Sequence, residues 1–198
     1  PKTDSEMYKK YWPGTHVVGK DIIRFHAIFW PAFLMAADLE PPKQIVAHGW
    51  WTNEGKKISK SSGNVIDPNE LIETYGLDSL RYFLFREVPF GNDGDFSKLA
   101  IKNRINGELA NNYGNLIQRI ISFIYKNLNQ TIDLTNENFN FEILLQINDT
   151  EKTLFDFVEN YKFDEYLKKL FIYLNDLNNY VDKKAPWTLK KTNPKEMK

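Results

Sequence analysis

Two lysines three residues apart lie in a short, hydroxyl-rich stretch, Lys57-Ile58-Ser59-Lys60-Ser61. Gly55 and Gly63 flank this stretch, which is therefore predicted to be a loop that can move. Two ammonium groups and several further donors on such a loop suit the binding of a polyphosphate. The alternative is a solvated surface loop, and for the five residues taken in isolation that alternative is favoured.

A second set of polar residues, Asn111, Asn115 and Arg119, recurs every four positions beside an apolar helical stripe. On a helix this spacing places all three on one face. Trp187 follows Pro186 just past a predicted helix end, where its ring can face solvent. Edge hydrogen bonds and aromatic stacking are how unpaired nucleic-acid bases are recognised. The row can equally be a plain solvated face and Trp187 a cap packed on its own bundle, and the spacing does not decide between these interpretations.

Composition limits what these residues can belong to. The 198 residues can form one large domain or two small ones and are enough to bury a hydrophobic core. There is no cysteine, which excludes a disulfide framework and a Cys-ligated zinc site and fits a reducing compartment. The longest apolar run covers the 11 residues 27–37 and is interrupted by Pro31. Because a bilayer span needs about 20 residues, we expect a core helix there, no membrane contact and, without a secretory leader, a cytoplasmic location.

The formal net charge is zero, but the charges are unevenly distributed. Nine acidic residues against two lysines lie between positions 132 and 165, and six lysines against two acidic residues lie between 182 and 198. A basic end on a neutral protein can meet phosphate, although a solvated lysine-rich tail is the more common case.

The first half of the chain, to about residue 96, is predicted to mix short strands and helices. Residues 15–18 form a strand, 21–37 a mostly apolar and hence buried helix that Pro31 should kink, and 45–51 a second buried strand. Residues 53–55 then turn the chain. Strand, helix and strand in this order indicate a right-handed parallel unit.

Two short helices should follow. Asp67 is the predicted N-cap of the first, with Glu70 closing a capping box, and Gly76 ends it. Asp78 is the predicted cap of the second, which covers residues 79–87.

The second half is predicted to be helical. Apolar residues recur every three or four positions over 101–124, 154–161 and 166–181, and Ala185-Pro186 ends the last stretch. Three amphipathic helices without strands between them indicate a bundle. The asparagine-rich stretch 127–140 should be a loop.

The residues that follow the lysine-rich loop make its pattern more specific. Together with Gly63-Asn64 and Asp67-Pro68, it resembles the KMSKS loop of class I aminoacyl-tRNA synthetases. The chain departs from that pattern at Ile58, where methionine is usual. Both residues are apolar and similar in volume, so we expect the anchoring of the loop to survive.

Upstream segments extend the resemblance. Gly19-Lys20-Asp21 with His26 looks like the Gly-x-Asp segment that meets the ATP ribose in this class. The whole string 19–32, the segment 47–51 and the segment 78–84 are very similar to bacterial methionyl-tRNA synthetases. Since the similarity runs in register from about residue 11 to residue 187, the chain is identified as a member of that family.

The resemblance implies an α/β fold followed by an all-α bundle. Residues 1–50 would be the C-terminal half of a Rossmann-type catalytic domain, 51–96 the KMSKS loop and a connecting α/β stem, and 97–198 a truncated anticodon-binding domain. The first half of the nucleotide fold with its HIGH motif, the connective domain and later helices of the family have no counterpart among these residues, and the chain begins at Pro1. We therefore expect a fragment that is inactive alone.

The resemblance also implies an ATP site and a reaction. Asp21 would accept hydrogen bonds from the ribose. Lys20, Lys57, Ser59 and Lys60 would hold the phosphates of ATP, which enters with Mg²⁺ as a substrate; no metal site is expected in this chain. The methionine carboxylate would attack the α-phosphorus and expel pyrophosphate, and the two loop lysines would act catalytically on the developing charge.

Ile22, His26 and Trp30 correspond to family positions that line the methionine side-chain pocket. Their spacing of four places them on one helix face, and a thioether packs well against aromatic surfaces. Ordinary core packing is the alternative for His26 and Trp30.

In the bundle, Asn115 and Arg119 correspond to positions that read the anticodon, and Trp187 to the aromatic on which an anticodon base stacks. The implied partners are methionine, ATP and a methionine-specific tRNA.

Three interpretations remain at this point. The chain belongs to a methionine enzyme, to a synthetase of the same class for leucine, isoleucine, valine or cysteine, or to a non-catalytic tRNA-binding module with a decayed nucleotide site. Phe25-His26 with residues 29–32 favours methionine, and the intact lysine loop argues against decay.

Overall fold

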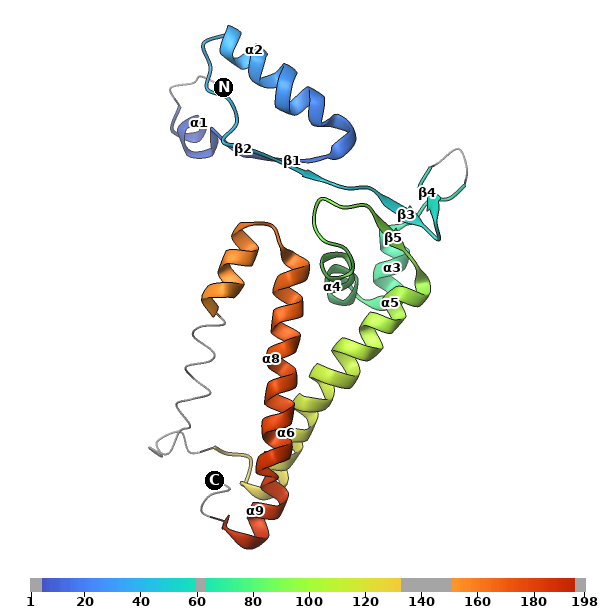
Figure 1. The fold of residues 1–198 in the computed structure, drawn as a ribbon, viewed down its shortest axis with the longest axis vertical. Helices are drawn as coiled ribbons and strands as arrows, with labels where there is room; N and C mark the ends of the chain where they lie inside the picture. The colour runs from blue at the N-terminus through green and yellow to red at the C-terminus, as the bar shows by residue number, and fades with distance from the viewer. Residues whose placement is uncertain (1–4, 60–62, 133–150, 195–198) are drawn as a thin grey trace. The chain divides into compact units, whose positions relative to one another are not determined.

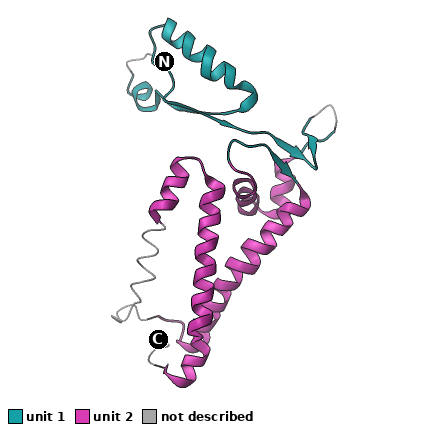
Figure 2. Ribbon diagram, viewed as in Figure 1, with its two compact units in different colours: residues 1–66, 90–96 teal, residues 67–89, 97–198 magenta. Residues whose placement is uncertain are grey.

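The computed structural model describes residues 5–59, 63–132 and 151–194. The chain divides into two compact units, shown in different colours in Figure 2. Unit 1 comprises Pro1–Ile66 and Phe90–Phe96, and unit 2 comprises Asp67–Pro89 and Ser97–Lys198. The segment 67–89 groups with the bundle because its helices pack there, whereas 90–96 adds a strand to unit 1. The functional division at residues 50 and 96 stays a prediction.

Unit 1 is built on a pair of parallel strands, β1 (Thr15–Gly19) and β2 (Gln44–His48). The register places Val18 opposite Ala47 and Gly19 opposite His48, so both strands end at the same edge. Val18 and Val46 are buried with Leu34, which comes from the intervening helix α2 (Trp30–Ala36). The predicted strand–helix–strand order is confirmed (Figure 1). A short helix, α1 (Glu6–Tyr11), precedes β1.

The segment between the two strands winds in three different ways. It starts as a 3₁₀ turn (Lys20–Ile22), continues as a π-helix (Phe25–Phe29) and becomes α-helical in α2. Pro31 lies in the first turn of α2, where its missing N–H costs no hydrogen bond within that helix.

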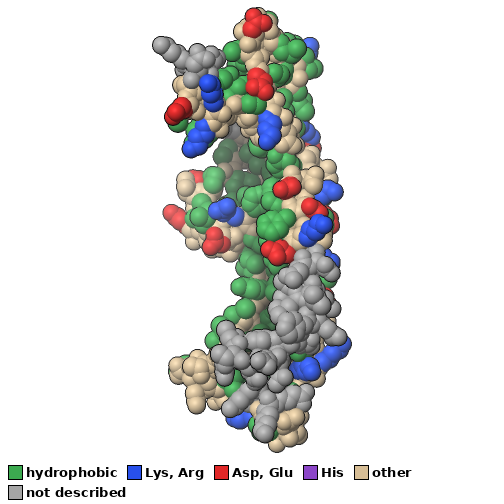
Figure 3. Space-filling model, turned by 90° about the vertical axis from the view of Figure 1, so that its left-hand side faces the viewer, with side chains coloured by type: hydrophobic (Ala, Val, Ile, Leu, Met, Phe, Trp, Pro, Cys, Tyr) green, Lys and Arg blue, Asp and Glu red, His purple; other side chains and the backbone are tan. Residues whose placement is uncertain are grey.

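The prediction that this helical segment is buried is wrong. Leu34 is buried, but Phe25, Ile28 and Phe33 are 57%, 60% and 68% exposed. The segment is mostly apolar, and among the described residues the sheet of β1 and β2 has only two strands, too few to cover it. Hydrophobic side chains accordingly lie open at the top of Figure 3, where unit 1 is drawn.

A second sheet in unit 1 has the order β4-β3-β5, from β3 (Trp51–Asn53), β4 (Lys56–Lys57) and β5 (Gly94–Phe96). β3 pairs antiparallel with β4 and parallel with β5. Glu54 and Gly55 turn the hairpin with φ of 51° and 74°, the signs of a tight primed turn. The predicted turn is confirmed, but the predicted strand 45–51 is divided, because β2 ends at His48 and Trp51 already belongs to β3.

Unit 2 begins with two helices, α3 (Pro68–Tyr75) and α4 (Leu77–Glu87). As predicted, Asp67 caps α3, accepting the Asn69 N–H at 2.8 Å, and Gly76 ends it with a φ of 82°. The prediction that Asp78 caps α4 is wrong. Gly76 also precedes α4 as its N-cap, so Asp78 lies in the first turn, where its charge still complements the helix dipole.

The rest of unit 2 is helical, as predicted. A rod runs through α5 (Lys98–Arg104), a π-helix (Ile105–Gly114) and α6 (Asn115–Asn127). The helix α8 (Phe163–Lys184) packs against the π-helix and α4, and residues 151–159 are helical too. At Ala185, with a φ of 41°, the chain turns into α9 (Pro186–Thr192). Residues 133–150, which hold much of the predicted loop, lie outside the described residues.

The core of unit 2 contains aromatic and aliphatic side chains from several helices, and its fully buried members are Phe83, Ile101 and Leu116. Beside this core, the Glu108 carboxylate accepts hydrogen bonds from Arg86 and Arg104 at 2.9 and 2.8 Å and from the Tyr82 hydroxyl. Burial, followed by the neighbouring Glu108 carboxylate, raises the pKa of Tyr82. These contacts tie α4 to the rod. No helix in the described part of the chain is long and apolar enough to cross a membrane.

Candidate functional site

The candidate nucleotide site lies where the two parallel strands of unit 1 end. Lys20 and Asp21 follow β1, and Gly49 and Trp50 follow β2. The carboxyl ends of parallel strands are where α/β sheets bind ligands. A Cβ on Gly49 would lie 2.0 Å from the Asn92 carbonyl oxygen. Glycine is therefore required for the segment before β5 to approach this edge.

The Trp50 side chain connects three predicted site residues. The Lys20 ammonium lies 4.4 Å from the centre of the Trp50 ring, and the Lys57 ammonium lies 5.9 Å from it. The indole N–H donates to Asp21 Oδ1 at 3.3 Å. Cations near an indole ring are attracted to its π-face. The structure thus brings Lys20, Asp21 and Lys57 around one aromatic ring.

Asp93 holds this cluster from the β5 side. Its carboxylate accepts the Lys20 ammonium at 2.6 Å on Oδ1 and 2.5 Å on Oδ2, and the Trp50 backbone N–H at 2.8 Å. The hydrogen bond from Lys20, followed by that from the Trp50 N–H, lowers the pKa of Asp93. The two side chains of the ion pair are 39% and 51% exposed.

The lysine loop is closed at its base by Asn64. Its side chain accepts from Asn53 Nδ2 at 2.7 Å and donates to the carbonyls of Lys56 and Lys57 at 3.2 Å each. The Ser59 N–H donates to the Asn64 carbonyl at 3.2 Å, so Ser59 lies at this closure. An open hollow of about 640 Å³ adjoins the loop, lined by Lys56, Lys57, Ser59, Gly63 and Asn64. The predicted catalytic residue Lys60 lies outside the described residues.

The predicted methionine-pocket residues follow Asp21 directly. His26 Nδ1 is 3.0 Å from the Ile22 carbonyl oxygen, and the His26 ring meets His16 edge-on at 6.1 Å. Ile22 and Trp30 are 38% and 39% exposed. The three residues lie in successive parts of the segment that follows β1: Ile22 in the 3₁₀ turn, His26 in the π-helix and Trp30 at the start of α2. Their surfaces are in part accessible.

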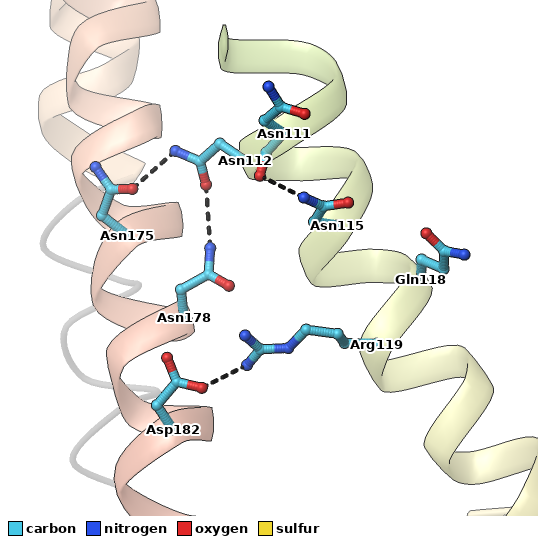
Figure 4. Close-up of a pocket in the computed structure, with 8 residues that line it drawn as sticks. All are labelled: Asn111, Asn112, Asn115, Gln118, Arg119, Asn175, Asn178 and Asp182. Atoms are coloured by element: carbon cyan, nitrogen blue, oxygen red, sulfur yellow. Dashed lines mark hydrogen bonds and ion pairs between the residues drawn. The ribbon is translucent and has the colours of Figure 1, made fainter. Parts of the chain in front are cut away.

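Unit 2 contains a polar pocket of about 560 Å³ between the rod and α8, shown in Figure 4. The lining residues are Asn111, Asn112, Asn115, Gln118, Arg119, Asn175, Asn178 and Asp182. The predicted polar row, Asn111, Asn115 and Arg119, therefore faces a hollow. Carboxamides present both donors and acceptors, as the edges of nucleobases do.

Hydrogen bonds cross this pocket at two levels. Asn112 donates to Asn175 at 2.7 Å and accepts from Asn178 at 3.0 Å. Arg119 makes an ion pair with Asp182 at 2.9 Å (Figure 4). The Arg119 guanidinium carbon also lies 5.8 Å from the centre of the Trp187 ring, and this ring is 47% exposed. The structure thus brings Trp187 close to Arg119, which lines the polar pocket.

Sequence reasoning missed several of these residues. Trp50 and Asp93 were assigned no role, because their contacts join positions far apart along the chain. The polar residues of α8 were also missed, although their spacing could have identified them. Asn175, Asn178 and Asp182 are three and four positions apart, which places them on one helix face. No group of three or more His, Cys, Asp or Glu side chains that could hold a metal ion occurs in the described ranges.

The family model described as "tRNA synthetases class I (M)" matches residues 1–121. The chain belongs to this family. It is 48% identical over 196 residues to a protein of Rickettsia bellii named methionine–tRNA ligase, covering 96% of this chain and 38% of the relative. The corresponding Campylobacter jejuni protein is 50% identical over 190 residues, covering 94% of this chain and 30% of the relative.

Solved structures agree with this assignment. Mycobacterium tuberculosis methionyl-tRNA synthetase bound by methionyl-adenylate superposes with a TM-score of 0.91 at 42% identity, covering 100% of this chain and 39% of that one. The free form of the same protein superposes with a TM-score of 0.87 at 40% identity, covering 100% and 38%. The chain therefore has a class I synthetase fold and spans about two fifths of the structures that it matches.

Proposed function

We propose that the complete gene product attaches methionine to its tRNA in an ATP-dependent reaction that passes through methionyl-adenylate. The observation that carries this proposal is the convergence of Lys20, Asp21 and Lys57 on the Trp50 ring. These are the donors and the acceptor that a nucleoside triphosphate requires. The family membership and the adenylate held by a structural relative support the same conclusion.

ATP enters as its Mg²⁺ complex. Asp21 accepts the ribose hydroxyls, since an ionised carboxylate offers acceptors only. Lys20, Lys57 and Lys60 neutralise the phosphates, with Ser59 as a further donor. When the methionine carboxylate attacks the α-phosphorus, negative charge grows on the departing pyrophosphate. Lysines that approach it most closely in the transition state lower the barrier, and movement of the loop delivers them.

Ile22, His26 and Trp30 select the methionine side chain. A flexible thioether gains contacts of about 0.3–1.5 kcal/mol at an aromatic ring. The partial exposure of Ile22 and Trp30 supports this role, because a core residue would have little surface left to offer a ligand.

Unit 2 reads the tRNA. Asn115 and Arg119 hydrogen bond to unpaired anticodon bases, and one base stacks on Trp187. In this proposal residues 1–50 are the second half of a Rossmann-type domain, 51–96 the loop and stem, and 97–198 the anticodon-binding bundle. The methionyl group passes to the terminal adenosine of the tRNA, in the cytoplasm where charged tRNA is consumed.

The test is pyrophosphate exchange by the complete gene product with each amino acid supplied separately. Exchange that depends on methionine is the expected result. Exchange with leucine, isoleucine, valine or cysteine instead would identify another synthetase of the class. Absence of exchange with every amino acid would support a non-catalytic tRNA-binding module.

A further inference from the structure

Lys20 has one anionic partner in the structure and another in the proposed reaction. In the structure its ammonium group is held by the Asp93 carboxylate through both oxygens, above the Trp50 ring. In the proposed reaction the same ammonium group binds a phosphate. A lysine ammonium has three N–H donors. Two of them go to the Asp93 oxygens, which leaves at most one for a phosphate, so the two anions compete for the donors of Lys20.

We propose that Asp93 is a positioning residue that holds Lys20 over Trp50 and releases it to the triphosphate when ATP binds. This inference rests on the proposed function of the site and adds a residue to it. Before ATP binds, Asp93 keeps the Lys20 ammonium at the end of the strands. The triphosphate of ATP then replaces the Asp93 carboxylate as the partner of Lys20.

The exposure of the pair makes this exchange feasible. Lys20 and Asp93 are 39% and 51% exposed, so water reaches both groups and compensates each when the pair opens. Ion pairs of this kind contribute little to stability. A triphosphate carries several negative charges and therefore replaces a single carboxylate readily.

Trp50 limits how far the released lysine can move. Its backbone N–H donates to Asp93 Oδ1 at 2.8 Å and its indole N–H to Asp21 Oδ1 at 3.3 Å, so Trp50 is held once at its backbone and once at its ring. Lys20 and Lys57 both lie within 6 Å of that ring. When the Lys20–Asp93 ion pair opens, the Lys20 ammonium can stay in contact with the Trp50 ring, close to Asp21 and Lys57.

Asp95, in β5 two residues after Asp93, provides a matched comparison. Its carboxylate accepts the Gly55 N–H at 2.8 Å and a hydrogen bond from the Thr52 hydroxyl. It thus anchors the β3–β4 hairpin as Asp93 anchors Trp50, but through neutral donors. Replacing Asp95 tests loss of an anchor without release of a lysine.

The experiment measures the Kd for ATP of the complete gene product by equilibrium dialysis. Asp93→Asn keeps the side-chain shape and an acceptor for the Trp50 N–H but removes the charge that competes for Lys20. The expected result is tighter ATP binding, by about two- to fivefold, the range of a half-exposed ion pair. Asp95→Asn should not tighten it. Unchanged or weaker binding by Asp93→Asn would overturn the proposal.

A double-mutant cycle separates competition from structural change. In a Lys20→Met background the Asp93→Asn substitution should no longer tighten ATP binding, because the lysine it would release is gone. An equal gain in both backgrounds would contradict competition for Lys20. If Asp93→Asn fails to fold, Asp93→Ser keeps a hydroxyl acceptor for Trp50 and carries the same expectations. Methionine-dependent exchange by the unsubstituted protein tests the proposed function separately, so the two can fail independently.

Discussion

At the scale of single residues, the proposed chemistry depends on where a few charges lie when the pyrophosphate leaves. Lys57 is exposed and its ammonium group lies 5.9 Å from the Trp50 ring centre. It is therefore free to shift toward a phosphate without breaking a buried contact. Asp21 is held by the indole N–H through one carboxylate oxygen, which leaves the other oxygen for a ligand. Lys57 and Asp21 thus lie at the Trp50 ring while keeping hydrogen-bonding capacity for a ligand.

Lys57→Ala in the complete gene product should slow adenylate formation by roughly 3 kcal/mol of barrier, because one charge-stabilising donor is lost. The affinity for methionine should change little. Single-turnover formation of the adenylate measures the first quantity and equilibrium dialysis the second. Lys56→Ala, at the adjacent position of β4, is the matched control and should cost much less. An activation rate that Lys57→Ala leaves intact would exclude the loop lysine from the mechanism.

Trp30→Ala should weaken methionine binding by about 1–3 kcal/mol through lost apolar and sulfur–aromatic contact. ATP affinity should remain close to that of the unsubstituted protein. Since Trp30 is 39% exposed, the melting temperature should change less than for a core aromatic. Phe33→Ala, 68% exposed on the same helix, is the control and should spare methionine binding. A joint fall in methionine affinity, ATP affinity and stability would mark Trp30 as a packing residue.

At the scale of elements, some strands and helix ends were predictable from local signals, whereas β4 and β5 were not predicted and the predicted strand 45–51 is divided. The β-branched strand at 15–18, the turn at 53–55 and the Asp67 cap all follow from residues adjacent in sequence. The wrong predictions share another origin. Burial of the 21–37 helix depends on what covers it, and the start of α4 depends on Gly76 serving two helices. The windings at 25–29 and 105–114 were not foreseen. A π-helix differs from an α-helix in which backbone groups hydrogen bond, and apolar residues three and four positions apart do not specify that choice.

The same division applies to the sites. Candidate residues on one loop or one helix face could be selected by spacing and family resemblance, and their roles stay predictions. Asp93 meets Lys20 across 73 positions, and Asn112 meets Asn175 across 63. Such contacts depend on chain folding that no local pattern encodes.

The hairpin anchor Asp95 leads to a pH prediction. Hydrogen bonds from the Thr52 hydroxyl and then from the Gly55 N–H lower the pKa of Asp95 below its ordinary 3.8. A carboxyl group with a lowered pKa in the folded state contributes stability above its unfolded pKa, and loses it as pH falls through the folded value. Thermal unfolding should be measured between pH 6 and pH 2 for Asp95→Asn and for the unsubstituted protein. The variant should be the less stable of the two near pH 6, and the difference in stability between them should shrink below about pH 4. A difference that stays constant across this range would show that the ionised form is not the one stabilised.

At the scale of the whole molecule, the two candidate sites lie in different compact units. The nucleotide cluster is confined to unit 1, and the asparagine-lined pocket with Arg119 and Trp187 is confined to unit 2. Chemistry and tRNA reading should therefore be separable by substitution.

Trp187→Ala in the complete gene product should weaken tRNA charging by about 1–3 kcal/mol, the value of one stacked base. Pyrophosphate exchange should be unaffected, because it needs no anticodon. Arg119→Ala should behave alike, and Arg119→Lys should rescue poorly if the planar guanidinium makes paired contacts. Tyr125→Ala, an exposed aromatic on α6, is the control. Equal losses for tRNAs with matched and altered anticodons would instead assign Trp187 a structural role.

If the complete gene product joins methionine to tRNA, the aminoacyl group that it attaches must be methionyl. The protein is incubated with ATP, Mg²⁺, tRNA and a mixture of the twenty amino acids, and the aminoacylated terminal adenosine is identified by mass spectrometry. We expect methionyl-adenosine from the unsubstituted protein and much less of it from Lys57→Ala. A different amino acid on the adenosine, or no aminoacylated product at all, would contradict the proposed function.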